Sequence, residues 1–136
     1  MKESQMFDVF HYDHIGIRVS DRSRAVKFYK QLGFSLEAVD ADGDLALVNK
    51  YGLRINLIPN ASGDEGNHNI LLDEPVKYTG VTHPAFTVHS LDEAMAAVRT
   101  KGIEITGGPK EEGRRRYFFI RDPDGTVLEF NEILAV

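Results

Sequence analysis

Two histidines and one glutamate stand at related positions of a sequence that repeats itself. His14 begins HIGIRVSD, and 69 residues later His83 begins HPAFTVHS. Glu129 lies in DGTVLEF near the end of the second repeat, where the first repeat carries Asn56 in YGLRINL. Two imidazoles and one carboxylate bind iron(II), manganese, nickel or zinc and leave positions for water or substrate. The repeat therefore predicts one metal site with His14, His83 and Glu129 as ligands.

The first repeat reads as one strand, one helix and three strands. Residues 14–19 alternate, so that His14 lies on the less apolar face of a half-buried strand. Asp21 is placed to cap a helix that Gly33 ends, and Asp42-Gly43 indicates a hairpin. Three short strands are expected near residues 35–39, 45–49 and 53–58.

The second repeat follows the same pattern. Ser90 and Glu93 form a capping box for a helix that runs to about Lys101. Strands are expected near residues 104–105, 116–121 and 126–131. The chain is thus predicted to be one α+β domain over residues 1–136, with βαβββ modules at about 12–58 and 83–133. The intervening residues 59–82 are either a lid over the site or a crossover to a partner, and we favour the lid.

Basic residues near the predicted site are candidates for binding substrate. Arg18 shares the strand face of His14. A run of three arginines ends at Arg116, and Tyr117 follows directly. An arginine binds carboxylate or phosphonate groups in a bidentate manner. Alternation puts Arg116 and Tyr117 on opposite faces without deciding which face is the site. His11, His68 and His89 are expected to be structural or exposed, although closure of the lid would bring His68 into the site.

Composition excludes several classes of protein. The net charge of −5 argues against nucleic acid or an anionic membrane as the main partner. No segment approaches the length of an apolar membrane span, and no secretion signal is evident at the start. With no cysteine there is no disulfide or thiolate ligand. A cytoplasmic protein that acts on a small molecule is expected.

These motifs resemble the vicinal oxygen chelate superfamily, which includes glyoxalases, fosfomycin-resistance proteins, bleomycin-resistance proteins and extradiol dioxygenases. The resemblance rests on HIGIRVSD with AVKFYKQLGF, on THPAFTV, and on FFIRDPDGTVLEF. It implies an eight-stranded open cup and one divalent metal, nickel, zinc, cobalt, manganese or iron. It also implies four ligand positions, which map to His14, Asn56, His83 and Glu129.

Asn56 departs from the glyoxalase pattern, which has a glutamate at that position. An amide oxygen is at most a weak ligand and a poor base, so Asn56 is either a weak ligand or a partner for a bound water. The remaining set keeps a net positive charge with a divalent ion and favours an anionic chelating substrate.

The resemblance favours a metal-dependent lyase or isomerase of the lactoylglutathione lyase type. Glu129 would then be the catalytic residue, acting as the base that moves a proton. The alternatives are an iron(II) ring-cleaving dioxygenase, a fosfomycin-type thiol transferase and, last, a metal-free drug-binding protein. A homodimer is expected, and the sequence leaves open whether the site lies within one chain or between two.

Overall fold

The computed structural model describes residues 6–64 and 66–134, and its elements divide into two halves. The first half contains β1 (Ile15–Arg18), α1 (Arg22–Gln31), β2 (Ser35–Val39), β3 (Leu45–Val48) and β4 (Arg54–Ile58). The second half contains β5 (Ala85–Thr87), α2 (Leu91–Thr100), β6 (Ile105–Glu112), β7 (Arg115–Arg121) and β8 (Val127–Ile133). The two predicted βαβββ modules are confirmed.

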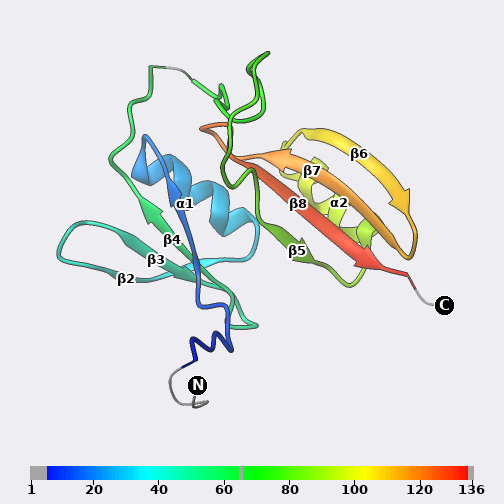
Figure 1. Cartoon of the computed structure of the whole chain (residues 1–136), viewed down its shortest axis with the longest axis horizontal. Helices are drawn as coiled ribbons and strands as arrows, with labels where there is room; N and C mark the ends of the chain where they lie inside the picture. Colours follow the sequence, from blue (N-terminus) through cyan, green and yellow to red (C-terminus); the bar gives the residue numbers. More distant parts are fainter. Residues whose placement is uncertain (1–5, 65, 135–136) are drawn as a thin grey trace.

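Each half forms its own four-stranded sheet (Figure 1). The strand orders are β1-β4-β3-β2 and β5-β8-β7-β6, so the first and last strands of each module lie side by side and parallel. The sheets do not close on each other, which agrees with the open cup that the resemblance implies.

Both helices begin where the sequence predicts. The side chain of Asp21 accepts a hydrogen bond from the amide of Arg24, and Ser90 accepts one from Glu93. These caps satisfy backbone donors that the first turn of a helix leaves free. Apolar residues of α1 and α2 then cover one face of their own sheets, which leaves the opposite sheet faces open.

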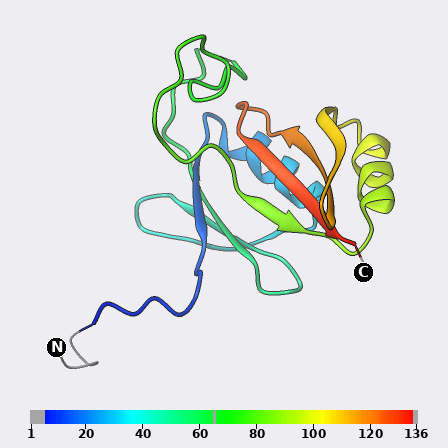
Figure 2. The ribbon, with the colours of Figure 1, turned by 45° about the vertical axis from the view of Figure 1, so that its right-hand side comes forward.

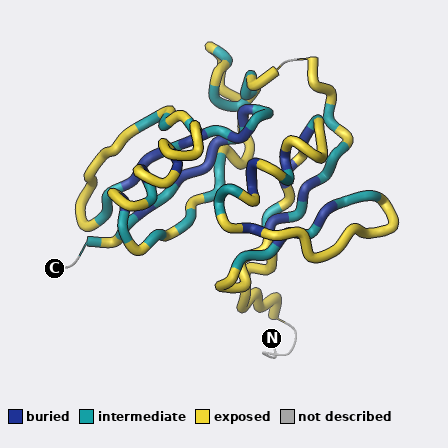
Figure 3. Tube along the Cα trace, turned by 180° about the vertical axis from the view of Figure 1, so that it is seen from behind, coloured by how far each residue is buried: buried dark blue, intermediate teal, exposed yellow. Residues whose placement is uncertain are grey.

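One continuous core joins the two modules. Phe34 follows the turn after α1 and packs near Phe86 of β5, and Phe86 stacks on Phe130 of β8. The Tyr29 hydroxyl donates a 2.8 Å hydrogen bond to Asp122 in the β7–β8 turn, and both side chains are buried. Figure 3 shows buried segments in both halves. The modules therefore fold as one unit.

The strand expected near residues 104–105 is longer than predicted. β6 continues to Glu112 as the edge strand of its sheet, with irregular pairing to β7 on both sides of Gly107. Glycine and proline in GGPK favour the end of a strand, but an edge strand tolerates both because it pairs on one side only. The longer strand extends the second sheet.

The segment between β4 and β5 folds against the β7–β8 turn and rises above one end of the molecule (Figure 2). Asp73 receives two 2.6 Å hydrogen bonds from Arg121, and Asn69 donates one to the carbonyl of Gly125. A Cβ atom on Gly125 would lie 2.0 Å from the Asn67 carbonyl oxygen, so this contact requires glycine. The segment is anchored to the second module. Neither described helix has the length and apolarity to cross a membrane.

Candidate functional site

Glu129 and His83 form the centre of the candidate site on the uncovered face of the second sheet. The parallel pairing of β5 and β8 sets Ala85 opposite Glu129 and brings His83, two residues earlier, within reach. His83 Nε2 lies 2.8 Å from Glu129 Oε1, and the Glu129 side chain is only 8% exposed. On its other side, His83 Nδ1 lies 2.9 Å from Thr82 Oγ1. The imidazole is therefore held in one orientation by two partners.

Arg115 occupies the other oxygen of the same carboxylate. Its Nη1 donates to Glu129 Oε2 at 3.2 Å and to Asn131 Oδ1 at 3.1 Å. The guanidinium also lies 4.6 Å from the ring centre of Tyr117. A buried carboxylate is costly unless it is paired and hydrogen-bonded, and Arg115 and His83 together meet that requirement.

The alternation of β7 decides which arginine faces this site. Tyr117 pairs with Asn131 and Phe119 pairs with Glu129, so Tyr117 belongs to the face of the site. Arg116 lies on the helix-covered face, where its Nη2 is 3.3 Å from Asp92 of α2. Its substrate role stays a prediction, but its guanidinium turns away from Glu129. Arg115 was not predicted as a site residue. Alternation could have indicated it, because Arg115 and Tyr117 are two residues apart on β7 and therefore lie on the same face as Glu129 of the paired strand.

Tyr117 is a hydrogen-bond donor on this face. Burial is the main cause that raises the pKa of the Tyr117 phenol, and a hydrogen bond to Glu112 raises it further. The phenol therefore remains protonated at neutral pH. It can orient an acceptor on a bound molecule without titrating.

The first module places its residues in the same register. Gly16 pairs with Asn56 across parallel β1 and β4, as Ala85 pairs with Glu129 in the second module. Asn56 and Glu129 are thus structurally equivalent, which the repeat implied. Asn56 is half-buried on the open face of its sheet.

Arg18 is exposed at the end of the edge strand β1, and His14 is exposed directly before that strand. His14 Nδ1 lies 2.6 Å from Asp13 Oδ2, and this hydrogen bond lowers the pKa of the Asp13 carboxyl. Arg18 Nε donates to Asn60 Oδ1 at 2.8 Å. Both side chains are therefore held by local partners.

The predicted ligands are only partly brought together. His83 and Glu129 are in contact, but no three His, Asp or Glu side chains in residues 6–64 and 66–134 are arranged to hold one metal ion. His14 and His83 line one open cleft of about 800 Å³, together with residues of the segment between the modules. The strand registers set His14 and Asn56 at positions equivalent to His83 and Glu129, so each module carries one candidate half-site.

The remaining histidines differ in their surroundings. His68 lines the same cleft and lies 3.6 Å from Glu74, both within the segment between the modules. His89 lies 3.4 Å from the hydroxyl of Tyr51, and His11 is exposed. His68 is the only one of these three that lines this cleft.

Comparison with known proteins identifies the family to which the chain belongs. The sequence model described as "Glyoxalase/Bleomycin resistance protein/Dioxygenase superfamily" matches residues 11–130. The uncharacterized protein YwkD of Bacillus subtilis is 33% identical, with 88% of this chain and 94% of that protein covered. The lactoylglutathione lyase of Haemophilus influenzae is 30% identical, with 88% of this chain and 90% of that protein covered.

A solved structure shows the same fold. A glyoxalase/dioxygenase from Nostoc punctiforme superimposes with a TM-score of 0.70 and 19% identity, covering 96% of this chain and all of that one. At this identity the likeness concerns the fold alone. It supports the two-module architecture independently of the sequence match.

Proposed function

Because this chain belongs to the Glyoxalase/Bleomycin resistance protein/Dioxygenase superfamily, we propose that it is a metal-dependent, glyoxalase-like enzyme of the lactoylglutathione lyase type. The observation that carries this proposal is the buried pair of His83 and Glu129 on the open sheet face. The substrate is a small, anionic molecule that binds the metal through two adjacent oxygen atoms. The superfamily also contains proteins that are not enzymes, so activity has to be measured.

The donor set fits a divalent cation. Imidazole nitrogen and carboxylate oxygen suit nickel, zinc, cobalt, manganese and iron(II). His83 and Glu129 would hold the ion with His14, and Asn56 would be at most a weak ligand. Such an ion would supply a Lewis acid that stabilises negative charge on substrate oxygens.

We propose that the complete site forms between two subunits of a homodimer. Within one chain His14 does not join His83 and Glu129, yet both modules present their half-site residues in the same register. A twofold axis would pair the first module of each chain with the second module of the other. Two equivalent sites would result.

Glu129 is the proposed catalytic residue. Arg115 holds Oε2, so we assign the proton transfer from substrate to Oε1, which lies 2.8 Å from His83 Nε2 in the absence of substrate. Tyr117 and Arg115 supply donors for the anionic part of the substrate on the same face. In this proposal Arg18 reaches the substrate from the partner's first module.

Mixed dimers test the shared site directly. His14→Ala and Glu129→Gln should each be inactive as homodimers in the glutathione hemithioacetal assay with methylglyoxal. If the two variants are refolded together, half of the dimers are mixed, and each mixed dimer contains one intact site. About a quarter of the wild-type activity should return. If the mixture stays inactive although both variants form dimers, the site is not shared between two subunits.

An iron(II) ring-cleaving dioxygenase is the second candidate. The specific observation in its favour is that Asn56 replaces a carboxylate, which leaves two histidines and one glutamate as the strong ligands. Protein purified without chelator and loaded under anaerobic conditions separates the two. Nickel, zinc or cobalt at one per site with isomerase activity supports the lyase, whereas oxygen uptake with iron and a catechol supports the dioxygenase.

A further inference from the structure

The two helices occupy equivalent places in the repeat but carry very different charge. α1 contains four basic residues and no acidic one, namely Arg22, Arg24, Lys27 and Lys30, whereas α2 contains Asp92, Glu93 and Arg99. Positive charge in the first turn of a helix is unfavourable, and α1 places Arg22 and Arg24 there. The chain as a whole has 21 acidic and 16 basic residues. Covering a sheet does not require the basic character of α1.

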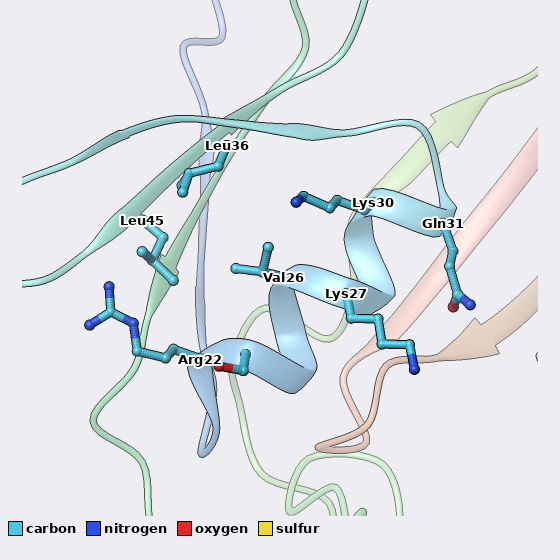
Figure 4. Close-up of a pocket in the computed structure, with 8 residues that line it drawn as sticks. Arg22, Val26, Lys27, Lys30, Gln31, Leu36 and Leu45 are labelled. Atoms are coloured by element: carbon cyan, nitrogen blue, oxygen red, sulfur yellow. The ribbon is translucent and has the colours of Figure 1, made fainter.

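Three of these basic residues, Arg22, Lys27 and Lys30, border an open groove of about 590 Å³ between this helix and the β2–β3 hairpin. Figure 4 shows Arg22, Val26 and Lys30 on one side of the helix, turned towards Leu36 and Leu45. The spacing of four residues puts these three on one helical face. The groove therefore has a cation near each end and an apolar floor.

The two cations at its ends are available for a ligand. Arg24 is 3.3 Å from Asp124, but across residues 6–64 and 66–134 neither Arg22 nor Lys30 forms an ion pair. Leu36 is 44% exposed on the floor. The groove thus offers positive charge and exposed apolar surface next to each other.

The groove is separate from the proposed metal site. Leu36 pairs with Leu47, a fully buried residue of the core that α1 covers. Asn56 pairs with Gly16 on the opposite face of the same sheet. An inference about the groove therefore does not depend on the proposed enzymatic function.

The spacing of the cations indicates the shape of the ligand. Arg22 and Lys30 are eight residues apart, which is about 12 Å along a helix axis. In an extended peptide, side chains four residues apart lie on one face about 13 Å apart, with the side chain midway between them on the same face. We propose that this groove binds an extended segment of another protein with the pattern acidic–x–apolar–x–acidic. The middle residue contacts Val26 and Leu36.

The ligand is not another copy of this chain. The sequence has acidic residues four positions apart only at Asp40 and Asp44, and the residue midway is Asp42, which is not apolar. A second α1 placed against the first would also bring like charges together. Charge complementarity therefore favours a different, acidic partner.

A labelled peptide tests the proposal on the full chain. Fluorescence anisotropy is measured with a capped peptide containing Glu-Thr-Val-Thr-Glu and with its Gln-Thr-Val-Thr-Gln counterpart. The acidic peptide should bind with a saturable curve and the neutral one much more weakly. The double variant Arg22→Glu with Lys30→Glu should bind the acidic peptide about tenfold more weakly, because two surface ion pairs contribute modestly. Circular dichroism checks that the variants are folded.

Arg99→Glu on α2 is the control for each single substitution in α1, since it reverses one charge on an exposed residue of the other helix, as Arg22→Glu or Lys30→Glu does alone. Its affinity for the acidic peptide should match the wild type. Leu36→Ser should also weaken binding, which separates the groove from a general basic surface.

Three outcomes would overturn the proposal. Equal binding of the acidic and neutral peptides would show that ion pairs do not contribute to binding. Equal weakening by Arg99→Glu would show that binding depends only on the net charge of the protein. Binding to vesicles of one-third phosphatidylserine, without saturable peptide binding, would show that α1 meets an anionic lipid surface instead.

Discussion

The two modules share one topology and one strand register, but their open sheet faces differ. In the second module, Glu129 is buried between His83 and Arg115, and β6 and β7 extend over seven or eight residues. In the first, the equivalent residue is the neutral Asn56, and β2, β3 and β4 have four or five residues. The same fold thus supports a charged half-site and a neutral one. Topology requires matching registers and apolar faces, whereas chemistry depends on a few residues that the fold leaves free.

The largest expected effect is on metal affinity. Glu129→Gln should weaken metal binding by more than about 100-fold, because it removes the anionic ligand and leaves Arg115 beside the ion. Asn56→Ala should change it by much less. Isothermal titration with nickel or zinc measures both. Equal losses in the two variants would mean that the half-sites contribute alike, and His89→Ala should have no effect.

The contacts between the modules should also be unequal. Tyr29→Phe removes the hydrogen bond to Asp122, and we expect unfolding to require about 1–3 kcal/mol less free energy, since both partners are buried. Tyr51→Phe alters the corresponding contact to His89, where Tyr51 is 65% exposed, and should change stability by less than about 0.5 kcal/mol. Urea denaturation of the two variants provides the comparison. Similar losses would contradict it.

Converting the neutral half-site into a charged one should strengthen the metal site. Asn56→Glu supplies a second carboxylate at the position equivalent to Glu129, and we expect about a tenfold gain in metal affinity. Methylglyoxal isomerase activity should rise as well if the missing carboxylate limits that reaction. Asn56→Gln is the matched control, because it has the same length without the charge. A gain in metal affinity without a gain in activity would point to the pocket as the limit.

The smallest expected effect concerns the segment between the modules, whose residues 67–73 are anchored to the second module by Arg121 and Gly125. The hydrogen bonds from Arg121 hold the pKa of Asp73 well below its usual range. A carboxyl with a lowered pKa in the fold contributes stability above the unfolded value of about 4, and this is lost progressively as the pH falls towards the folded value. Hydrogen exchange of residues 66–78, corrected for intrinsic rates, should therefore accelerate below about pH 4.

Asp73→Asn tests the origin of this pH dependence. The variant should exchange faster than the wild type at neutral pH and lose the additional acceleration in acid. Asp122 has the opposite sign, since burial raises the pKa of its carboxyl, so its protonation is favoured by folding. A wild-type segment that exchanges at the same corrected rate from pH 6 to pH 3 would exclude a role for Asp73.

Much of the fold follows from local pattern. The caps at Asp21 and Ser90 predicted where both helices begin, and the alternation of apolar residues predicted the succession of strands along the chain. β6 was predicted too short, because glycine and proline end most strands but are tolerated at a sheet edge. The repeat aligns His14 with His83, and the strand register agrees with its alignment of Asn56 with Glu129, whereas their role as metal ligands stays a prediction.

The sequence by itself determined the two modules and the alternation of side chains between the two faces of each strand, and it predicts which residues would bind a metal. Only the tertiary structure decided that Arg115, rather than Arg116, faces Glu129, and that within residues 6–64 and 66–134 no third ligand completes a metal site with His83 and Glu129. Alternation assigns side chains to opposite faces but does not say which face a helix covers. That choice depends on contacts between residues distant in the sequence, such as those of α2 with β7 and of Arg121 with Asp73.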